Sequence, residues 1–177
     1  MGAAREVGVF GVPLREEVAA FMTETVLVID DDPAMLDFLT QRLAAEGLTI
    51  SIAGSGLHGI NQAIDLDPDL ILLDLRMPDP DGWAVCKMLR ANPKTQHIPI
   101  IAVTGVLLPG QLEQAMASGA DDIAFKPIDM ADLLIRIRAM LRCRGIHGPI
   151  ERRTRYMEIA REESAKSARP HPPASKE

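Results

Sequence analysis

Short apolar runs alternate with segments of helical periodicity along most of the chain. The apolar runs cover residues 26–29, 48–53, 70–73, 98–103 and 123–126. All except 48–53 lack a regular alternation with polar residues, as expected of strands buried on both faces of a sheet. Apolar residues spaced by three or four predict helices between and after these runs, one beginning at Pro33 and the others over 55–65, 82–91, 109–118 and 130–142. This order predicts an α/β protein with a doubly wound, five-stranded parallel sheet in three α/β/α layers.

The pattern divides the chain into three parts. Residues 25–144 hold the alternating elements and form the expected domain. Residues 1–24 are interpreted as an N-terminal extension that is absent from the native product if translation starts at Met22. Residues 145–177 are richer in basic side chains, and we expect a solvated helix over 151–167 followed by a disordered end. This tail is too short for an output domain, so we expect a single-domain protein.

Charge and composition exclude several classes of protein. The net charge of −6 argues against direct binding to DNA or other nucleic acids, which requires a basic face. Two cysteines without a CxxC spacing predict neither a disulfide framework nor a metal site. The sequence has no apolar run long enough for a membrane span and no signal peptide, so we expect a cytoplasmic protein.

Polar residues stand where the predicted strands end. Asp30 and Asp31 follow the first strand, and Asp74 follows the third. Thr104 follows the fourth strand, and Lys126 ends the fifth. The carboxyl ends of parallel strands line one edge of a sheet, where ligands bind. These side chains should therefore converge on a single site.

The chemistry of this set indicates phosphoryl transfer. Three close carboxylates repel one another unless a cation joins them, and Mg²⁺ prefers hard oxygen ligands of this kind. A carboxylate neutralised in this way can attack phosphorus and form an acyl phosphate. The lysine supplies positive charge and the threonine a hydrogen bond for phosphoryl oxygens, while Gly105 leaves room beside them.

Five motifs carry these residues: Val-Ile-Asp30-Asp31-Asp32-Pro33, Leu-Asp74-Leu-Arg-Met77-Pro78-Asp79-Pro80-Asp81-Gly82, Ala-Val-Thr104-Gly105, Gly119-Ala120-Asp121-Asp122 and Lys126-Pro127. With them, the chain from about Thr25 to Arg144 resembles a response-regulator receiver domain of two-component systems, of the single-domain, chemotaxis-regulator-like kind. The resemblance implies a flavodoxin-like (βα)5 fold. It also implies a signalling protein that assists its own phosphorylation and dephosphorylation and is not otherwise an enzyme.

The resemblance assigns roles to the acidic residues. Asp74 would accept a phosphoryl group from a phosphohistidine on a sensor histidine kinase or phosphotransfer protein. Asp31 would ligate Mg²⁺ directly and Asp30 would assist, with Asp74 and the backbone carbonyl of Arg76 as further ligands. The side chains of Arg76 and Val106 occupy positions that tune dephosphorylation in this family, so we expect an altered lifetime of the phosphoryl group.

The resemblance also assigns the coupling residues. Thr104 and Lys126 would contact the phosphoryl group and couple it to the loop after the fourth strand. The Lys126–Pro127 peptide is expected to be cis. The family usually has an aromatic residue three positions before the lysine, where this chain has Ile123. That difference argues against a switch that depends on an aromatic rotamer.

The signalling surface is expected around the fourth and fifth predicted helices. Leu133 and Met140 lie outside the stripe expected to face the sheet, and with Leu107 and Leu108 they suggest an exposed apolar patch. Burial of all four in the core is the alternative interpretation. An exposed patch would bind a downstream protein, whose identity is unknown, or support a homodimer through these helices.

Two other functions are compatible with parts of the sequence. Gly54, Gly56 and Gly59 form a GxGxxG pattern between a strand and a helix, which is typical of a dinucleotide-binding domain. Its place after the second strand and the short helix favour a tight turn and close packing instead. An aspartyl-phosphate phosphatase would need an Asp-x-Asp pair after its first strand, which residues 30–32 contain only incidentally.

Overall fold

Five parallel strands form the centre of the molecule. The computed structural model describes residues 24–105, 117–146 and 148–167. The strands pair in the order β2-β1-β3-β4-β5, and every neighbouring pair is parallel. Their bounds are β1 Thr25–Ile29, β2 Thr49–Ala53, β3 Leu70–Asp74, β4 Ile100–Thr104 and β5 Asp122–Phe125. The predicted doubly wound parallel sheet is confirmed, with bounds that differ from the predicted ones by about one or two residues.

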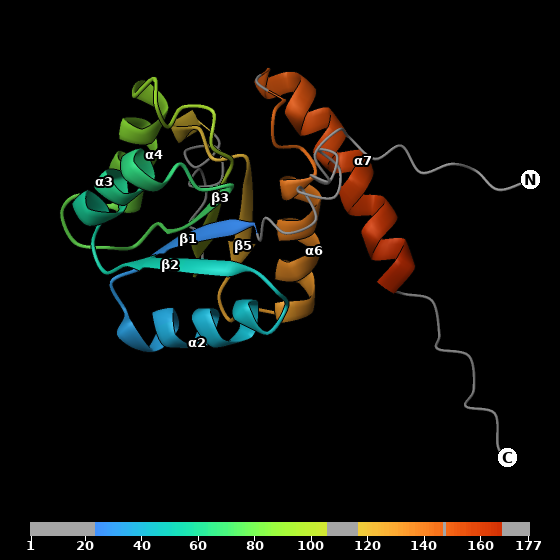
Figure 1. The fold of residues 1–177 in the computed structure, drawn as a ribbon, viewed down its shortest axis with the longest axis horizontal. Coiled ribbons are helices and arrows are strands. Elements are labelled where there is room, and N and C mark those ends of the chain that lie inside the picture. Colours follow the sequence, from blue (N-terminus) through green and yellow to red (C-terminus); the bar gives the residue numbers. More distant parts are fainter. Residues whose placement is uncertain (1–23, 106–116, 147, 168–177) are drawn as a thin grey trace, which may run out of the picture.

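Helices cover both faces of the sheet (Figure 1). Their bounds are α2 Pro33–Ala44, α3 Gly56–Leu66, α4 Gly82–Ala91, α6 Met130–Leu141 and α7 Pro149–Ser167. The helix predicted over 109–118 lies almost entirely outside the described residues. None of the helices in the described parts of the chain has both the length and the apolar character needed to cross a bilayer.

Local capping explains why the helices begin where they do. The residue before each of α2, α3, α4 and α6 accepts a hydrogen bond from a backbone N–H of the first turn, which otherwise has no partner in the helix. These caps are Asp32, Ser55, Asp81 and Asp129. Because the caps at Asp32 and Asp81 belong to the two acidic motifs, the same short segments end a strand, supply the site and begin a helix.

The core consists of two layers, one on each face of the sheet. Val26 and Val28 of β1 pack with side chains of α2 and α6, whereas Leu27 and Ile29 pack with those of α3 and α4. Successive residues of a strand point to opposite faces, so a strand covered on both sides needs apolar residues at every position. This requirement explains the unbroken apolar runs of the sequence.

The C-terminal segment differs from the expected solvated helix. Helix α7 is present, but it packs against α6 (Figure 1) and buries Arg152, Tyr156 and Ile159. These residues are spaced by four and three positions and so lie on one face of the helix. The polar composition of the segment concealed this face because one of its buried members is an arginine.

The expected exposed patch is wrong for the two residues that the structure describes. Leu133 is 1% exposed and Met140 is fully buried. Both belong to the core layer that Tyr156 and Ile159 of α7 also join. Leu107 and Leu108, the other members of the predicted patch, lie outside the described residues.

The glycines of α3 serve close packing. A Cβ atom at Gly59 would lie 2.4 Å from the Cδ1 atom of Ile29, and one at Gly56 would lie 2.5 Å from a methyl carbon of Val85. These glycines therefore face the packed interior, where a bound dinucleotide would have no room. The geometry favours the interpretation of the GxGxxG pattern as a turn with tight packing.

Gly82, the first residue of α4, is predicted to be the least tolerant of the glycines near the acidic site. A Cβ atom there would lie 2.1 Å from the backbone oxygen of Asp74, which cannot move without moving β3. We expect Gly82→Ala to lower the free energy of unfolding by about 1–3 kcal/mol in urea denaturation. Gly54→Ala is the control, because nothing lies within 4 Å of its added methyl group. Equal stability of the two variants would contradict this account of α4 packing.

Candidate functional site

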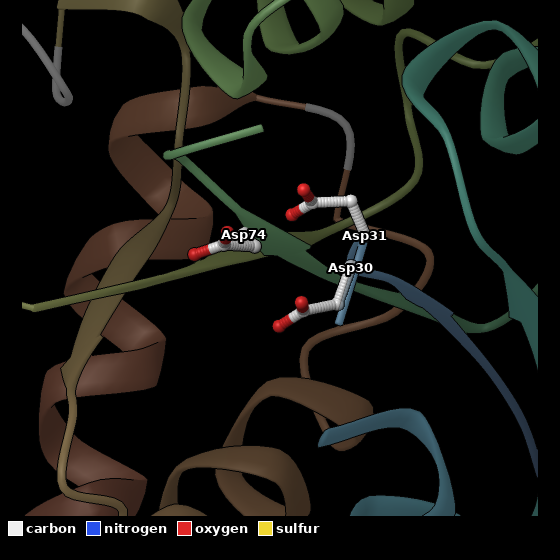
Figure 2. Close-up of side chains that lie close together, drawn as sticks. All are labelled: Asp30, Asp31 and Asp74. Carbon is white, nitrogen blue, oxygen red and sulfur yellow. The ribbon is translucent and has the colours of Figure 1, made fainter. Parts of the chain in front are cut away.

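Three carboxylates gather at the carboxyl ends of two neighbouring strands. Asp30 and Asp31 follow β1, and Asp74 is the last residue of β3. Figure 2 shows the three side chains directed to the same side. Each offers a carboxylate oxygen, and these oxygens all lie within 4.8 Å of one another. The structure therefore brings together the acidic residues that the sequence placed at one edge of the sheet.

Lys126 is the cation at this site. Its Nζ atom lies 2.9 Å from Oδ2 of Asp30 and 3.2 Å from Oδ1 of Asp74. The other oxygen of Asp30 accepts a hydrogen bond from the backbone N–H of Asp32 at 2.9 Å. The Lys126–Pro127 peptide is cis, as expected. One lysine thus joins two carboxylates from different strands, while the Asp31 side chain is exposed to solvent.

The charges at this site change the acidity of its groups. Burial, and then the charge of Asp30, raise the pKa of the Asp74 carboxyl, although Lys126 and the backbone N–H of Arg76 act in the opposite direction. Burial acts to lower the pKa of Lys126, but its hydrogen bond to Asp30 and the charges of both carboxylates outweigh this effect and raise it. Lys126 therefore stays charged, and negative charge on Asp74 is costly unless a further cation is present.

Thr104 and Lys126 are joined through the backbone. Thr104 ends β4 and is 1% exposed, and its carbonyl oxygen accepts a hydrogen bond from the backbone N–H of Lys126 at 2.6 Å. β3 and β4 are neighbours, so the ends of these strands place Thr104 near Asp74. The threonine, the lysine and the acidic cluster thus lie at the same edge of the sheet.

The side chain of Arg76 occupies a position that the sequence did not predict. A Cβ atom at Gly105 would lie 2.4 Å from Nη2 of Arg76, so the guanidinium lies directly against this glycine. The sequence predicts room for a phosphoryl group beside Gly105. It assigns the backbone carbonyl of Arg76 to the metal site and the Arg76 side chain to a position that tunes dephosphorylation, but it does not place that side chain against the glycine. The glycine after Thr104 is the signal that could have indicated close approach by another group.

The position usually occupied by an aromatic residue is filled by a core aliphatic. Ile123 is buried in the layer between the sheet and helices α3 and α4. Phe125, two residues later at the end of β5, is 53% exposed. The nearby aromatic ring therefore does not share the buried environment of Ile123.

Comparison with known proteins identifies the family. The family model described as a response regulator receiver domain matches residues 26–138. The chain belongs to this family. The matched range contains every residue of the site and ends before α7 begins.

Curated relatives share this part of the chain. A DNA-binding dual master transcriptional regulator, RpaA of Synechocystis, is 42% identical over 120 residues, which cover 66% of this chain and 48% of the relative. The response regulator PleD of Caulobacter vibrioides is 39% identical over 121 residues, which cover 68% of this chain and 27% of the relative. The chain matches about half or less of the length of these two proteins.

Solved structures share the same fold. A CheY-like response regulator receiver domain protein from Methanospirillum hungatei aligns with a TM-score of 0.66 at 28% identity, covering 72% of this chain and 100% of that chain. A two-component response regulator from Clostridium difficile aligns with a TM-score of 0.64 at 29% identity, covering 68% of this chain and 97% of that chain. The sheet and its covering helices are therefore those of a CheY-like receiver domain.

Replacing Asp74 by asparagine is expected to stabilise the metal-free protein. The substitution removes one of the charges that repel in the acidic cluster, and Lys126 keeps Asp30 as a partner. We expect a gain of about 1 kcal/mol, or roughly 2–4 °C in Tm, in EDTA at neutral pH.

The effect should depend on pH with a defined sign. Because the pKa of Asp74 is raised in the folded protein, its protonation favours folding. The advantage of Asp74→Asn should thus be largest above the folded-state pKa and disappear below about pH 4, where the wild-type carboxyl is protonated in both states. Thermal melts across this range test the prediction, and a variant less stable than wild type at pH 7 would contradict it.

Proposed function

We propose that Asp74 accepts a phosphoryl group from a phosphohistidine and that the protein relays this signal to a downstream protein. The observation that carries the proposal is the pairing of Lys126 with both Asp30 and Asp74 inside a cluster of three carboxylates. Membership of the receiver family supports the same function. No enzymatic activity beyond the protein's own phosphorylation and dephosphorylation is proposed.

The acidic cluster suits Mg²⁺. It offers hard carboxylate oxygens in close proximity, and Lys126 contacts two of the three carboxylates, those of Asp30 and Asp74. We propose that Asp31 and Asp74 hold the ion with the backbone carbonyl of Arg76, and that Asp30 assists. When bound, Mg²⁺ would neutralise carboxylate charge and bind phosphoryl oxygens.

The protein's own residues would carry the transfer as follows. A carboxylate oxygen of Asp74 attacks phosphorus, an O–P bond forms, and the N–P bond to the donor imidazole breaks. Lys126 exchanges its contact with Asp74 for a phosphoryl oxygen and keeps its contact with Asp30. The Thr104 hydroxyl donates a hydrogen bond to another phosphoryl oxygen, which would draw the end of β4 toward the site.

The proposed partners follow from the family and from charge. A sensor histidine kinase or a phosphotransfer protein would supply the phosphohistidine. RpaA is named as a DNA-binding regulator, but this chain matches only 48% of it. The net charge of −6 does not favour direct contact with nucleic acid, so we propose a protein as the downstream partner.

Phosphorylation of Asp74 is tested by intact mass. The protein is incubated with acetyl phosphate and Mg²⁺, and we expect the mass of one added phosphoryl group that disappears when EDTA replaces Mg²⁺. Asp74→Asn should give no adduct. Asp65→Asn, which changes an exposed aspartate at the far end of α3, should be phosphorylated like wild type.

A second measurement is needed because some receiver domains are not phosphorylated by small phosphodonors such as acetyl phosphate. Beryllofluoride mimics a bound phosphoryl group, and its binding with Mg²⁺ can be followed by ¹⁹F NMR. A wild-type protein that neither forms the adduct nor binds beryllofluoride would overturn the proposed function. An adduct that persists in Asp74→Asn would show that another residue is the acceptor.

The guanidinium of Arg76 is expected to lengthen the lifetime of the phosphoryl group. It lies against Gly105, the residue after Thr104. We propose that in this position it would limit the approach of water to the phosphorus atom on Asp74. We expect Arg76→Ala to accelerate dephosphorylation several-fold, which corresponds to about 1 kcal/mol of barrier. Decay of the adduct after removal of acetyl phosphate measures this rate. Decay at the wild-type rate would show that the arginine does not shield the site.

A further inference from the structure

Helix α7 lies outside the range that the family model matches, and it covers a surface of the receiver domain. It lies across α6 and reaches the amino-terminal end of β5, the edge strand of the sheet (Figure 1). Among the α7 side chains that the structure describes, three are buried: Arg152, Tyr156 and Ile159. The other side chains of α7 over residues 150–165 are exposed or half-buried. We call the surface beneath α7, formed by α6 and the start of β5, the α6–β5 face.

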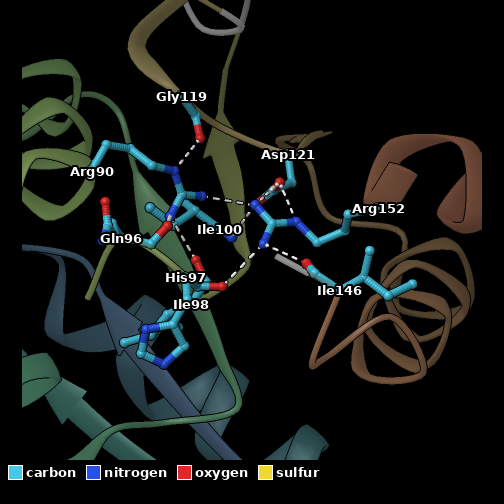
Figure 3. A network of polar contacts seen from close by, with 9 residues as sticks. All are labelled: Arg90, Gln96, His97, Ile98, Ile100, Gly119, Asp121, Ile146 and Arg152. Atoms are coloured by element: carbon cyan, nitrogen blue, oxygen red, sulfur yellow. Dashed lines mark hydrogen bonds and ion pairs between the residues drawn. The ribbon is translucent and has the colours of Figure 1, made fainter. Parts of the chain in front are cut away.

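The first anchor of α7 is an ion pair with a buried arginine. Arg152 is 5% exposed, and its Nε and Nη2 atoms lie 2.8 and 2.7 Å from Oδ1 of Asp121 (Figure 3). Its Nη1 atom donates to the carbonyl oxygen of His97 at 3.0 Å. The other oxygen of Asp121 binds Arg90 of α4 at 2.7 Å and accepts the N–H of Ile100 at 2.8 Å. Asp121 thus ties α7 to α4 and β4.

The second anchor is a tyrosine. The Tyr156 hydroxyl donates to the carboxylate of Asp122, which also pairs with Arg136 of α6 through a 2.7 Å contact. Tyr156 and Ile159 add their apolar surface to the core layer that includes Met140. The buried contacts of α7 are thus two polar contacts to aspartates, Asp121 and Asp122, and a short row of apolar contacts. The attachment of α7 therefore depends strongly on polar groups at the amino-terminal end of β5.

We propose that α7 is a built-in cover that keeps a second copy of the chain off the α6–β5 face, and that release of Arg152 opens this face to self-association. The proposal rests on the proposed function, because it takes α6, the fifth helix predicted from the sequence, as part of the surface through which the signal is relayed. Once uncovered, the face would present apolar α6 side chains together with both acidic and basic groups, Asp122 and Arg136 among them. A surface that carries both signs can pair with its own copy about a two-fold axis.

The structure also supplies a probe of the cover. Tyr156 is the only tyrosine of the chain. Burial, and then the charge of Asp122, raise its pKa above the ordinary value, although Arg136 acts in the opposite direction. Ultraviolet absorbance of tyrosinate during an alkaline titration therefore reports whether α7 is docked.

Arg152→Gln is the release variant, and Arg153→Gln is its matched control. Both remove one arginine charge from adjacent positions, but the Arg153 side chain is exposed, at the rim of the pocket that Tyr156 also lines. In Arg152→Gln we expect Tyr156 to ionise near pH 10, and we expect self-association to tighten by at least tenfold in sedimentation equilibrium, without any phosphate mimic. Wild type and Arg153→Gln should keep the raised tyrosine titration and stay monomeric.

A second release variant separates loss of the cover from loss of the fold. Ile159→Glu places a charge in the buried row of apolar contacts of α7 and leaves Asp121 and Arg152 intact. It should reproduce the release and the self-association, with helical circular dichroism retained for the rest of the domain. If both release variants unfold, α7 is a structural part of the domain, and the proposal of a releasable cover is overturned.

Further outcomes would overturn the proposal. One is a wild-type protein that dimerises as tightly as Arg152→Gln. Another is a variant in which Tyr156 ionises at its ordinary pH but the protein does not self-associate. The third is a titration of Tyr156 that Arg152→Gln leaves unchanged. The proposed function is measured separately, as the phosphoryl adduct on Asp74 in the same proteins. Because Asp121 and Asp74 lie at opposite ends of the sheet, Arg152→Gln should still accept the phosphoryl group. If phosphorylation fails, the proposed function is wrong, whereas the self-association of Arg152→Gln still decides whether α7 is a cover.

Discussion

The negative charge held at the carboxyl edge of the sheet is the constraint on which the site depends. Asp30 and Asp74 are both buried, and Lys126 contacts both of them. Burial makes charge on Asp74 costly, so its pKa is raised and the cluster favours any process that brings in positive charge. Binding of a metal ion and chemistry at the carboxylate are both ways to relieve this cost.

The parallel sheet is what makes such a concentration of charge possible. Neighbouring strands β1 and β3 end together, so residues far apart in the sequence are held a few ångströms apart by backbone hydrogen bonds. Gly82 keeps α4 close against the backbone of Asp74, and the caps at Asp32 and Asp81 begin helices directly beyond the acidic motifs. The site therefore has a closely packed base and is open to solvent at Asp31.

The edge strand β5 connects two charged centres, one with a cation between two carboxylates and one with a carboxylate between two cations. Lys126, at its carboxyl end, is a cation between two acids, whereas Asp121, just before its amino end, is an acid between Arg90 and Arg152. Breaking a buried pair leaves an uncompensated charge, which is usually costly. The strand spans only four residues, so one short element connects the proposed acceptor site with the anchor of α7.

Much of this arrangement could be predicted from the sequence. Unalternated apolar runs followed by Asp, Thr and Lys predicted the strands, their parallel pairing and the convergence of Asp30, Asp31 and Asp74. These features depend on local periodicity and on a general rule about sheet edges, so one chain is enough to reveal them. The roles of the individual residues at the site stay predictions that the proposed phosphorylation measurements test.

Other features were decided by contacts between distant segments. The sequence predicted α7 as a solvated helix because Arg152 contributes no apolar signal, and only the tertiary structure shows it buried against Asp121. For the same reason Leu133 and Met140 suggested an exposed patch, although they belong to the core layer that α7 joins. The sequence by itself thus determined the strands, the sheet and the residues of its edge through local patterns. The tertiary structure alone decided which surface α7 covers and where the Arg76 side chain lies, because those outcomes depend on the pairing of charges and the packing of side chains far apart in the chain.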